Sequence, residues 1–328
     1  MRASALLPRL IPALLGLATS AFAAVAPVTV TATAQNYRGW PDAIILRNAT
    51  TEAIIVPSIG RVMQFRFVGE TDGPFWENEK LAGRPMPTAP WTVAHGSFGG
   101  DKTWPAPQSL WDWPPPTAFD AAPNTASIDP SGTVTLAAPM DSKLGLRALR
   151  RISLDPVEPV MRITTTYEKI SGVPVIVSVW VITQLRDPIA VFMTTPEPSL
   201  FPTGANREWP APAEFLRREN GWMRFTRNPA KSQKTGNDGT SLVWAGARHL
   251  LRITIPRVVG ADYPDAGCSV EIYGNEDPFP YVELETLGPL KTLRPGERLS
   301  ATTSYQLAPR SPAPLEADVR ALLATPSP

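Results

Sequence analysis

A succession of short β-rich segments separated by polar turns is the feature that most constrains the fold of this chain. β-Branched residues dominate 160–169 and 173–185, and such residues favour strands. Asp129-Pro130-Ser131-Gly132 has the composition of a hairpin turn between two further β-rich runs. Helical periodicity is weak and is limited to 213–219 and the end of the chain. We therefore predict an all-β sandwich or barrel.

Both ends of the chain differ from the strands between them. Residues 1–23 carry two arginines ahead of an apolar run and end in Ala21-Phe22-Ala23, the pattern of a secretory signal peptide. The apolar run is too short to span a bilayer, so we expect a periplasmic or secreted protein with no membrane insertion after cleavage. We expect a single β domain over 24–309 and a tail over 310–328, in which 315–323 could form a short helix.

The balance of charge and the single cysteine exclude several functions. Two of the 31 basic residues lie in the signal peptide, so 29 remain against 30 acidic residues, with no long basic run. We expect no nucleic acid partner, because phosphate contacts dominate such binding. Cys268 is the only cysteine and starts a β-rich run, which excludes an internal disulfide and predicts a buried, inert thiol.

The most unusual stretch is His95-Gly96-Ser97-Phe98-Gly99-Gly100-Asp101-Lys102-Thr103-Trp104, which Pro105-Ala106-Pro107 follows. Glycine costs backbone entropy and proline removes a ladder donor, so we predict an ordered loop rather than a helix or a central strand. The imidazole of His95 and the side chains of Asp101, Lys102 and Trp104 are candidates for binding a ligand. The alternative is a structural loop whose rings only plug the end of a sheet.

Two acidic side chains share a face in the run 281–290. Because side chains alternate along a strand, Tyr281, Glu283 and Glu285 point to one side. If that side lines a cleft, like charge and partial burial raise one carboxyl pKa towards the range of a general base. If it faces bulk solvent, it is an ordinary polar face.

Two further segments offer binding groups. Trp180 and Gln184 share a face of the run 178–185. On such a face the tryptophan ring can stack on sugar C–H groups, and the amide can hydrogen-bond to specific hydroxyls. An ordinary protein core can accommodate the same two side chains. Lys234, in the polar stretch 231–239, could reach a ligand oxygen or simply be solvated.

The sequence gives no sign of a bound cofactor. No phosphate loop, dinucleotide fingerprint or zinc-protease motif is present. The two histidines, His95 and His249, are far apart and too few for a three-histidine zinc site, which leaves only a site of mixed histidine and glutamate ligands open. We predict no cofactor and no metal.

Together these segments resemble the galactose mutarotase-like superfamily of aldose 1-epimerases over about residues 50–308. The resemblance is closest to a bacterial branch with a Gly-Gly-Asp-x-x-Trp-Pro-x-Pro loop, here 99–107. The segment 95–99 is similar to the epimerase loop that binds sugar hydroxyls, and Glu285-Thr286 is similar to the strand that carries the catalytic glutamate.

The resemblance implies a large antiparallel β-supersandwich that binds a mono- or oligosaccharide. It implies that Glu285, or Glu283, takes the proton of the anomeric hydroxyl, and that His95 orients a hydroxyl or protonates the ring oxygen. Epimerases carry a second histidine on the strand that matches 173–185, where this chain has Trp180. Three functions stay open: an exported sugar-binding protein with or without epimerase chemistry, a glycan lyase or hydrolase, and a non-catalytic envelope scaffold or protein-interaction domain.

Overall fold

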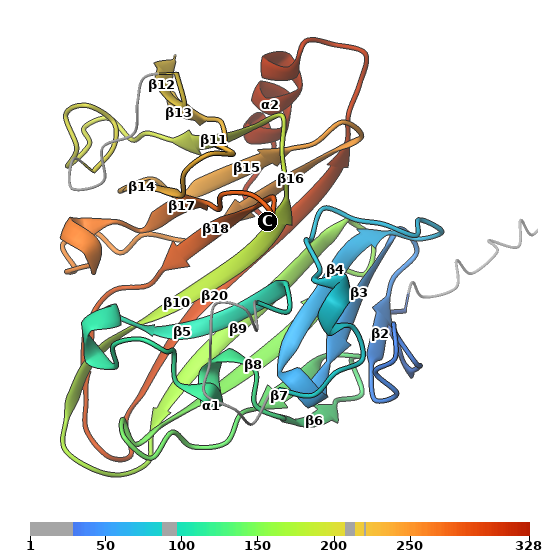
Figure 1. Ribbon diagram of the computed structural model, residues 1–328, viewed down its shortest axis with the longest axis vertical. Helices are drawn as coiled ribbons and strands as arrows, with labels where there is room; N and C mark the ends of the chain where they lie inside the picture. The colour runs from blue at the N-terminus through green and yellow to red at the C-terminus, as the bar shows by residue number, and fades with distance from the viewer. Residues whose placement is uncertain (1–28, 87–96, 207–213, 220) are drawn as a thin grey trace, which may run out of the picture.

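The computed structural model describes residues 29–86, 97–206, 214–219 and 221–328. The predicted signal peptide and His95 lie outside these residues. Within them the chain forms two ten-stranded sheets in which every strand pair is antiparallel, so the predicted all-β sandwich is confirmed (Figure 1).

The first sheet carries the strands with most of the predicted site residues. In spatial order its strands are β1 (Thr31–Ala34), β2 (Ile44–Arg47), β3 (Thr51–Val56), β4 (Arg61–Phe67), β5 (Gly100–Ala106), β10 (Val175–Arg186), β18 (Tyr281–Leu287), β17 (Val270–Gly274) and β14 (Gln233–Asn237), with β19 (Lys291–Leu293) paired to β10. The three central strands β5, β10 and β18 therefore come from distant parts of the sequence.

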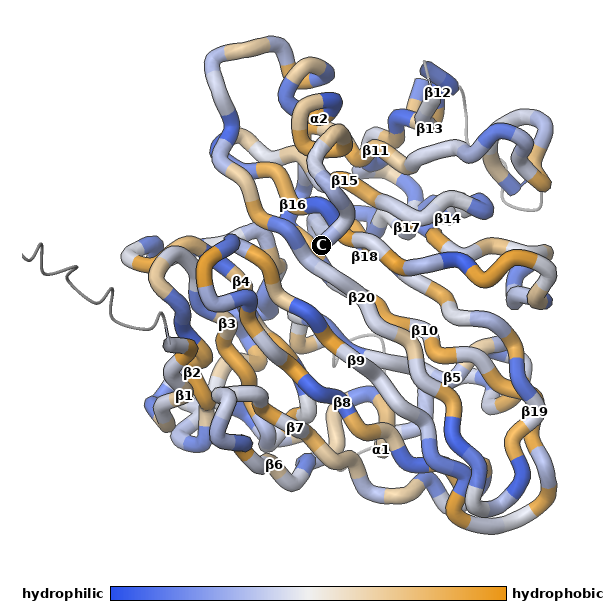
Figure 2. The backbone as a smooth tube through the Cα atoms, turned by 180° about the vertical axis from the view of Figure 1, so that it is seen from behind, coloured by the Kyte–Doolittle hydropathy of each residue, from blue (hydrophilic) through white to orange (hydrophobic). Residues whose placement is uncertain are grey.

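The second sheet packs behind the first. Its order is β12 (Leu216–Glu219), β13 (Trp222–Phe225), β11 (Ala190–Thr194), β15 (Ser241–Ala245), β16 (His249–Thr254), β20 (Arg298–Pro309), β9 (Val160–Lys169), β8 (Leu146–Leu154), β7 (Val134–Ala137) and β6 (Thr125–Ile128). Along β8, buried residues alternate with more exposed ones. Figure 2 shows hydrophobic and hydrophilic residues interleaved along the strands of this sheet, as expected where one face packs on a core.

One prediction of local structure was wrong. The helical periodicity at 213–219 gives way to β12, because pairing with β13 outweighs a weak intrinsic preference. The short helix expected over 315–323 is confirmed as α2 (Leu315–Ala324), whose buried Val319 and Leu322 pack on the outer side of the second sheet. Among the described residues, no helix is long and apolar enough to cross a membrane.

The predicted loop at 95–104 is also partly a strand. From Gly100 onward it forms β5, which pairs with β10 along its whole length. Gly100 has a φ of +72°, and a Cβ there would lie 2.5 Å from the carbonyl oxygen of Val62, so only glycine fits this start. Pro105 is tolerated because β4 pairs with β5 only at Val62 and Asp101, leaving the later part of β5 without a partner on that side.

A buried group of charged and polar side chains ties the two sheets together. Asp101 on β5 forms an ion pair with Arg150 on β8, and both side chains are almost fully buried. The other carboxylate oxygen of Asp101, Oδ2, accepts hydrogen bonds from the Thr183 hydroxyl at 2.7 Å and from the Tyr305 hydroxyl at 2.5 Å. Asp101, predicted to bind substrate, therefore points between the sheets, because alternation along β5 turns it away from its neighbour Lys102.

Replacing Asp101 by alanine tests this placement. Asp101→Ala leaves the buried Arg150 guanidinium without its counter-ion, and we expect the free energy of unfolding to fall by roughly 3–5 kcal/mol. Urea denaturation followed by circular dichroism measures it. Glu197→Ala, at a side chain that is 86% exposed, is the control and should change stability by less than about 0.5 kcal/mol. A comparably small loss for Asp101→Ala would contradict a buried ion pair.

Candidate functional site

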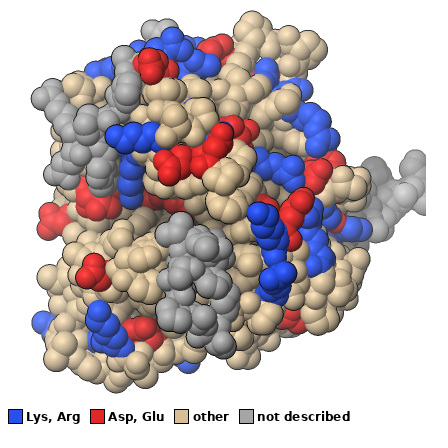
Figure 3. All heavy atoms as spheres, in the orientation of Figure 1, with Lys and Arg blue, Asp and Glu red and all other residues tan. Residues whose placement is uncertain are grey.

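A cavity of about 480 Å³ opens on the face of the first sheet that points away from the second sheet. We call this face the open face. Strands β5, β10, β18, β17 and β14 supply the floor, and the segments around Trp76, Trp113 and Phe279 form the rim. Figure 3 shows acidic side chains gathered at a hollow on this side of the molecule.

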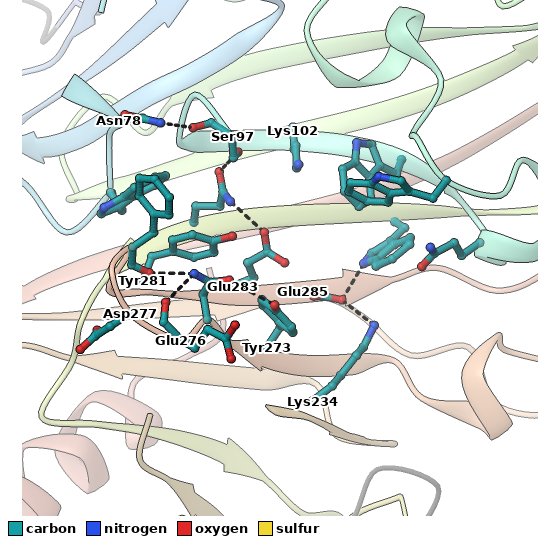
Figure 4. A pocket seen from close by; sticks show the side chains of 18 of the residues that line it. Asn78, Ser97, Lys102, Lys234, Tyr273, Glu276, Asp277, Tyr281, Glu283 and Glu285 are labelled. Atoms are coloured by element: carbon teal, nitrogen blue, oxygen red, sulfur yellow. Dashed lines mark hydrogen bonds and ion pairs between the residues drawn. The ribbon is translucent and has the colours of Figure 1, made fainter. Parts of the chain in front are cut away.

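Eight of the predicted site residues line this cavity: Lys102, Trp104, Trp180, Gln184, Lys234, Tyr281, Glu283 and Glu285. Strand register explains why they meet, since β10 places Trp180 opposite Trp104 and Gln184 opposite Glu283. Asp101 lies between the sheets, and His95 lies outside the described residues. The predicted shared face of Tyr281, Glu283 and Glu285 is thus the open face, and it meets a cleft rather than bulk solvent (Figure 4).

Glu283 occupies the middle of the cavity and is half-buried. Its Oε1 accepts a hydrogen bond from Gln184 Nε2 at 2.9 Å, and the Ser97 hydroxyl in turn donates to Gln184 Oε1. Burial raises the pKa of Glu283 to about 7; the carboxylate of Glu285 adds to this rise, while Lys102 and the Gln184 amide oppose it. Near neutral pH this carboxyl group can therefore either accept or donate a proton.

Glu285 is buried and held by two donors. Its Oε2 accepts a hydrogen bond from Trp180 Nε1 at 2.9 Å and lies 3.2 Å from Lys234 Nζ. Lys234 Nζ also lies 2.9 Å from Glu271 Oε2 and sits 4.8 Å from the centre of the Trp180 ring. Burial disfavours the charged form of this ammonium group, but the carboxylates of Glu285 and Glu271 outweigh the effect of burial and raise the pKa of Lys234. Glu285 is thus fixed in position.

Two of these positions correct or extend the sequence analysis. Lys234 lies on β14 and not in a loop, because β17 pairs with 233–237. Glu271 was not identified, although alternation along 270–274 places it on the same face as Tyr273, a residue that lines the cavity. Burial raises the pKa of Glu271 well above its ordinary value, and Lys234 offsets only part of that rise.

Lys102 belongs to a second buried cluster, centred on Asp120 at the end of the short helix α1 (Thr117–Asp120). Asp120 Oδ1 lies 3.1 Å from Lys102 Nζ and 3.0 Å from Arg61 Nη2, and it accepts a hydrogen bond from Trp104 Nε1 at 3.0 Å. Burial lowers the pKa of Lys102, with Asp120 opposing. Burial also disfavours the Asp120 carboxylate, but the positive charges of Lys102 and Arg61 outweigh the effect of burial and lower the pKa of Asp120. Neither Asp120 nor Arg61 was predicted as a site residue, because the two side chains meet only through the fold.

No group of three histidine, cysteine, aspartate or glutamate side chains within the described part of the chain is arranged to hold a metal ion. His249 lies at the start of β16 in the second sheet and contacts Glu70, with 2.9 Å between Nε2 and Oε1. Cys268 is buried, as predicted, and burial raises the pKa of its thiol.

The raised pKa of Glu283 predicts how stability depends on pH. The folded-state pKa of about 7 exceeds the ordinary value of 4.5. Between these two pH values the folded state therefore binds more protons than the unfolded state, and the protein loses stability as the pH rises through 7. We therefore compare the free energy of unfolding of Glu283→Gln with that of the natural protein. This difference should favour the variant by roughly 2 kcal/mol more at pH 8 than at pH 5. Urea denaturation at both pH values measures this. An equal effect of Glu283→Gln at pH 5 and at pH 8 would contradict a raised pKa for this half-buried carboxyl group.

Comparisons with known proteins support the architecture. No protein-family model and no curated protein matches the chain. Among solved structures, a galactose mutarotase-like protein from Lactobacillus casei aligns with a TM-score of 0.53 and 10% identity over 81% of this chain and 100% of that one. A galactose mutarotase-like protein from Clostridium acetobutylicum aligns with a TM-score of 0.51 and 10% identity over 86% of this chain and 99% of that one.

A larger protein shares the same architecture. A TPR-domain containing protein from Parabacteroides distasonis aligns with a TM-score of 0.59 and 14% identity over 87% of this chain and 49% of that one. The chain thus spans about half of that protein's length. At these low identities the likeness establishes the architecture alone. The chain has the galactose mutarotase-like fold.

Proposed function

We propose that this protein binds a carbohydrate in the cavity on the open face and that Glu283 exchanges a proton with the anomeric centre of the sugar. The observation that carries this proposal is the position of Glu283. It is a half-buried carboxyl group with a pKa of about 7, hydrogen-bonded to Gln184, in a cavity whose walls include several aromatic rings. The sugar class of ligand also agrees with the fold, because structural neighbours are described as galactose mutarotase-like.

The chemistry of the walls suits a sugar. The rings of Trp104, Trp180 and Tyr281 can stack on the apolar C–H faces of a pyranose. Gln184 and Glu283 can form hydrogen bonds with particular hydroxyl groups of the sugar. An envelope scaffold instead needs a broad apolar surface for its partner. The polar groups inside this cavity favour a small polar ligand over such a partner.

Glu283 is a better base than Glu285. The Oε2 of Glu285 already meets the Trp180 indole and the Lys234 ammonium, which hold that carboxylate in place. Among the described residues, Glu283 accepts its hydrogen bond from the neutral amide of Gln184. With its raised pKa, Glu283 can take the proton of the anomeric hydroxyl at neutral pH, and Glu285 positions Lys234 and Trp180 around the sugar.

Lys102 is the best proton donor among the described residues of the cavity. Its pKa is lowered by burial, so its ammonium gives up a proton more readily than an ordinary lysine. The pKa values of Lys234 and Tyr281 are raised, Tyr281 by burial and by Glu283, which makes both groups poor acids. As Glu283 takes the hydroxyl proton, the bond from the anomeric carbon to the ring oxygen breaks and the ring oxygen takes a proton from Lys102. The oxygen of the anomeric hydroxyl becomes the carbonyl oxygen of the open-chain aldehyde. After rotation about the bond to the next carbon, the ring oxygen returns its proton to Lys102 and attacks the other face of the carbonyl, whose oxygen takes its proton back from Glu283. The anomer is thereby inverted.

Binding without catalysis is the second candidate function. It is favoured by the ion pairs of both cavity lysines, Lys102 with Asp120 and Lys234 with Glu285 and Glu271, which oppose proton release. In both cases we propose that the protein acts outside the cytoplasm, in line with the signal peptide pattern. Catalysis and binding alone are distinguished by whether the anomers interconvert faster with protein present.

Polarimetry of freshly dissolved α-glucose and α-galactose tests the catalytic proposal. We expect the protein to accelerate mutarotation, with a rate that rises with pH through about 7 as Glu283 ionises. Glu283→Gln should lower the rate by roughly 10²-fold or more. Glu197→Gln, at a side chain that is 86% exposed and does not line the cavity, serves as the matched control and should keep most of the rate.

The outcomes separate the two candidates. A rate no faster than buffer with either sugar, together with binding heat in calorimetry, rejects catalysis and keeps the binding function. No heat with any mono- or oligosaccharide rejects the carbohydrate proposal as a whole.

A further inference from the structure

We propose that the ligand is an oligosaccharide of neutral or amino sugars that lies along β10 and β18 and bridges two separate clusters of aromatic rings. This inference rests on the proposed carbohydrate function and names the class of sugar. It follows from where the rings stand in the strand register and from the charges that lie between them.

The first cluster stands at the start of β18, and we call it the Tyr281 cluster. The rings of Trp76 and Tyr281 lie with centres 4.6 Å apart and planes tilted by 34°, and Phe279 meets Trp76 edge-on at 6.3 Å. All three residues line the cavity and are half-buried. Part of each side chain is thus accessible to a ligand.

The second cluster stands at the other end of the cavity, and we call it the Trp104 cluster. Trp104 meets Trp180 edge-on at 5.5 Å and Trp113 edge-on at 6.4 Å. Trp104 and Trp180 form a buried floor, whereas Trp113 is 49% exposed at the rim. Asp120 holds the Trp104 indole through its N–H group, so this wall is rigid where it meets the cavity.

The distance between the two clusters exceeds one sugar ring. In the pairing of β10 with β18, Trp180 lies opposite Leu287, and Tyr281 lies opposite Arg186. Six strand residues separate these two levels, which corresponds to about 20 Å at the usual rise per residue. Glu283 and Glu285 lie between them along β18 (Figure 4). A single pyranose can therefore stack on one cluster only, while a chain of sugars can reach both.

The charges that line the cavity disfavour anionic sugars. Glu276, Glu283 and Glu285 contribute carboxylates without an arginine partner, and Asp277 is paired with Arg227 at 3.0 Å. The two lining lysines are both already paired with carboxylates. A uronate or sulfate would meet like charge, and the described residues that line the cavity offer it no uncommitted cation. Neutral sugars meet no such penalty, and amino sugars are attracted.

A glycan array followed by calorimetry tests the proposal. The array carries neutral, amino-sugar and uronic acid oligosaccharides of one to six units, and the glycan with the strongest signal is then titrated at each length. We expect neutral or amino-sugar glycans to bind best and the affinity to rise roughly tenfold or more from one unit to four, because the longer chain reaches the second cluster.

Variants at the two clusters give an independent readout. We expect Trp76→Ala and Trp113→Ala each to lower the affinity for the four-unit glycan by roughly tenfold, and at most one of them to affect the single sugar. Trp76→Phe and Trp113→Phe keep a ring and should retain most of the affinity. Val259→Ala, at an exposed residue that does not line the cavity, is the control and should change nothing. Thermal unfolding of each variant shows whether it is folded.

Four results would overturn the inference. If single sugars bind as tightly as the longest glycan, the carbohydrate function is kept and the bridging oligosaccharide is rejected. The same conclusion follows if uronic acid glycans bind best. If both alanine variants weaken the single sugar as much as the four-unit glycan, the clusters form one subsite. Absence of binding to every glycan overturns this inference and the proposed function together.

Discussion

The register of β5, β10 and β18 is the constraint on which the rest of the site depends. Because side chains alternate along each strand, a slip of one residue would turn Glu283, Glu285 and Gln184 into the core and bring Val282 and Leu284 to the open face. Hydrophobic burial between the two sheets makes such a slip unfavourable. The same burial that stabilises the fold thus aligns three strands from distant parts of the chain around one cavity.

The central strand β5 carries charge on both faces, and each of these charges has a buried partner. On β5, Asp101 turns towards Arg150 between the sheets, and its neighbour Lys102 turns towards Asp120 on the open face. Buried ion pairs add little net stability, but loss of one partner is costly. These pairs therefore fix the positions of their own side chains. Glu283 accepts its hydrogen bond from the neutral amide of Gln184 and is the carboxyl group of the cavity best able to exchange a proton.

The sequence predicted what depends on local alternation and missed what depends on distant partners. The shared faces of Tyr281, Glu283 and Glu285 and of Trp180 and Gln184 follow from a period of two, and the structure brings both faces to the cavity. From Gly100 onward the expected loop is a strand, and so is the polar stretch around Lys234, because β10 and β17 offer pairing partners that composition does not reveal. The placement of Asp101 and the roles of Asp120 and Glu271 likewise depend on residues far away in the sequence.

The most direct test of the carbohydrate site is a crystal structure of the protein grown with the glycan that binds most tightly. The predicted result is continuous sugar density across β10 and β18, stacked on the rings at the two ends of the cavity and within hydrogen-bonding distance of Glu283. Sugar bound elsewhere on the surface, with the cavity free of sugar, would contradict it.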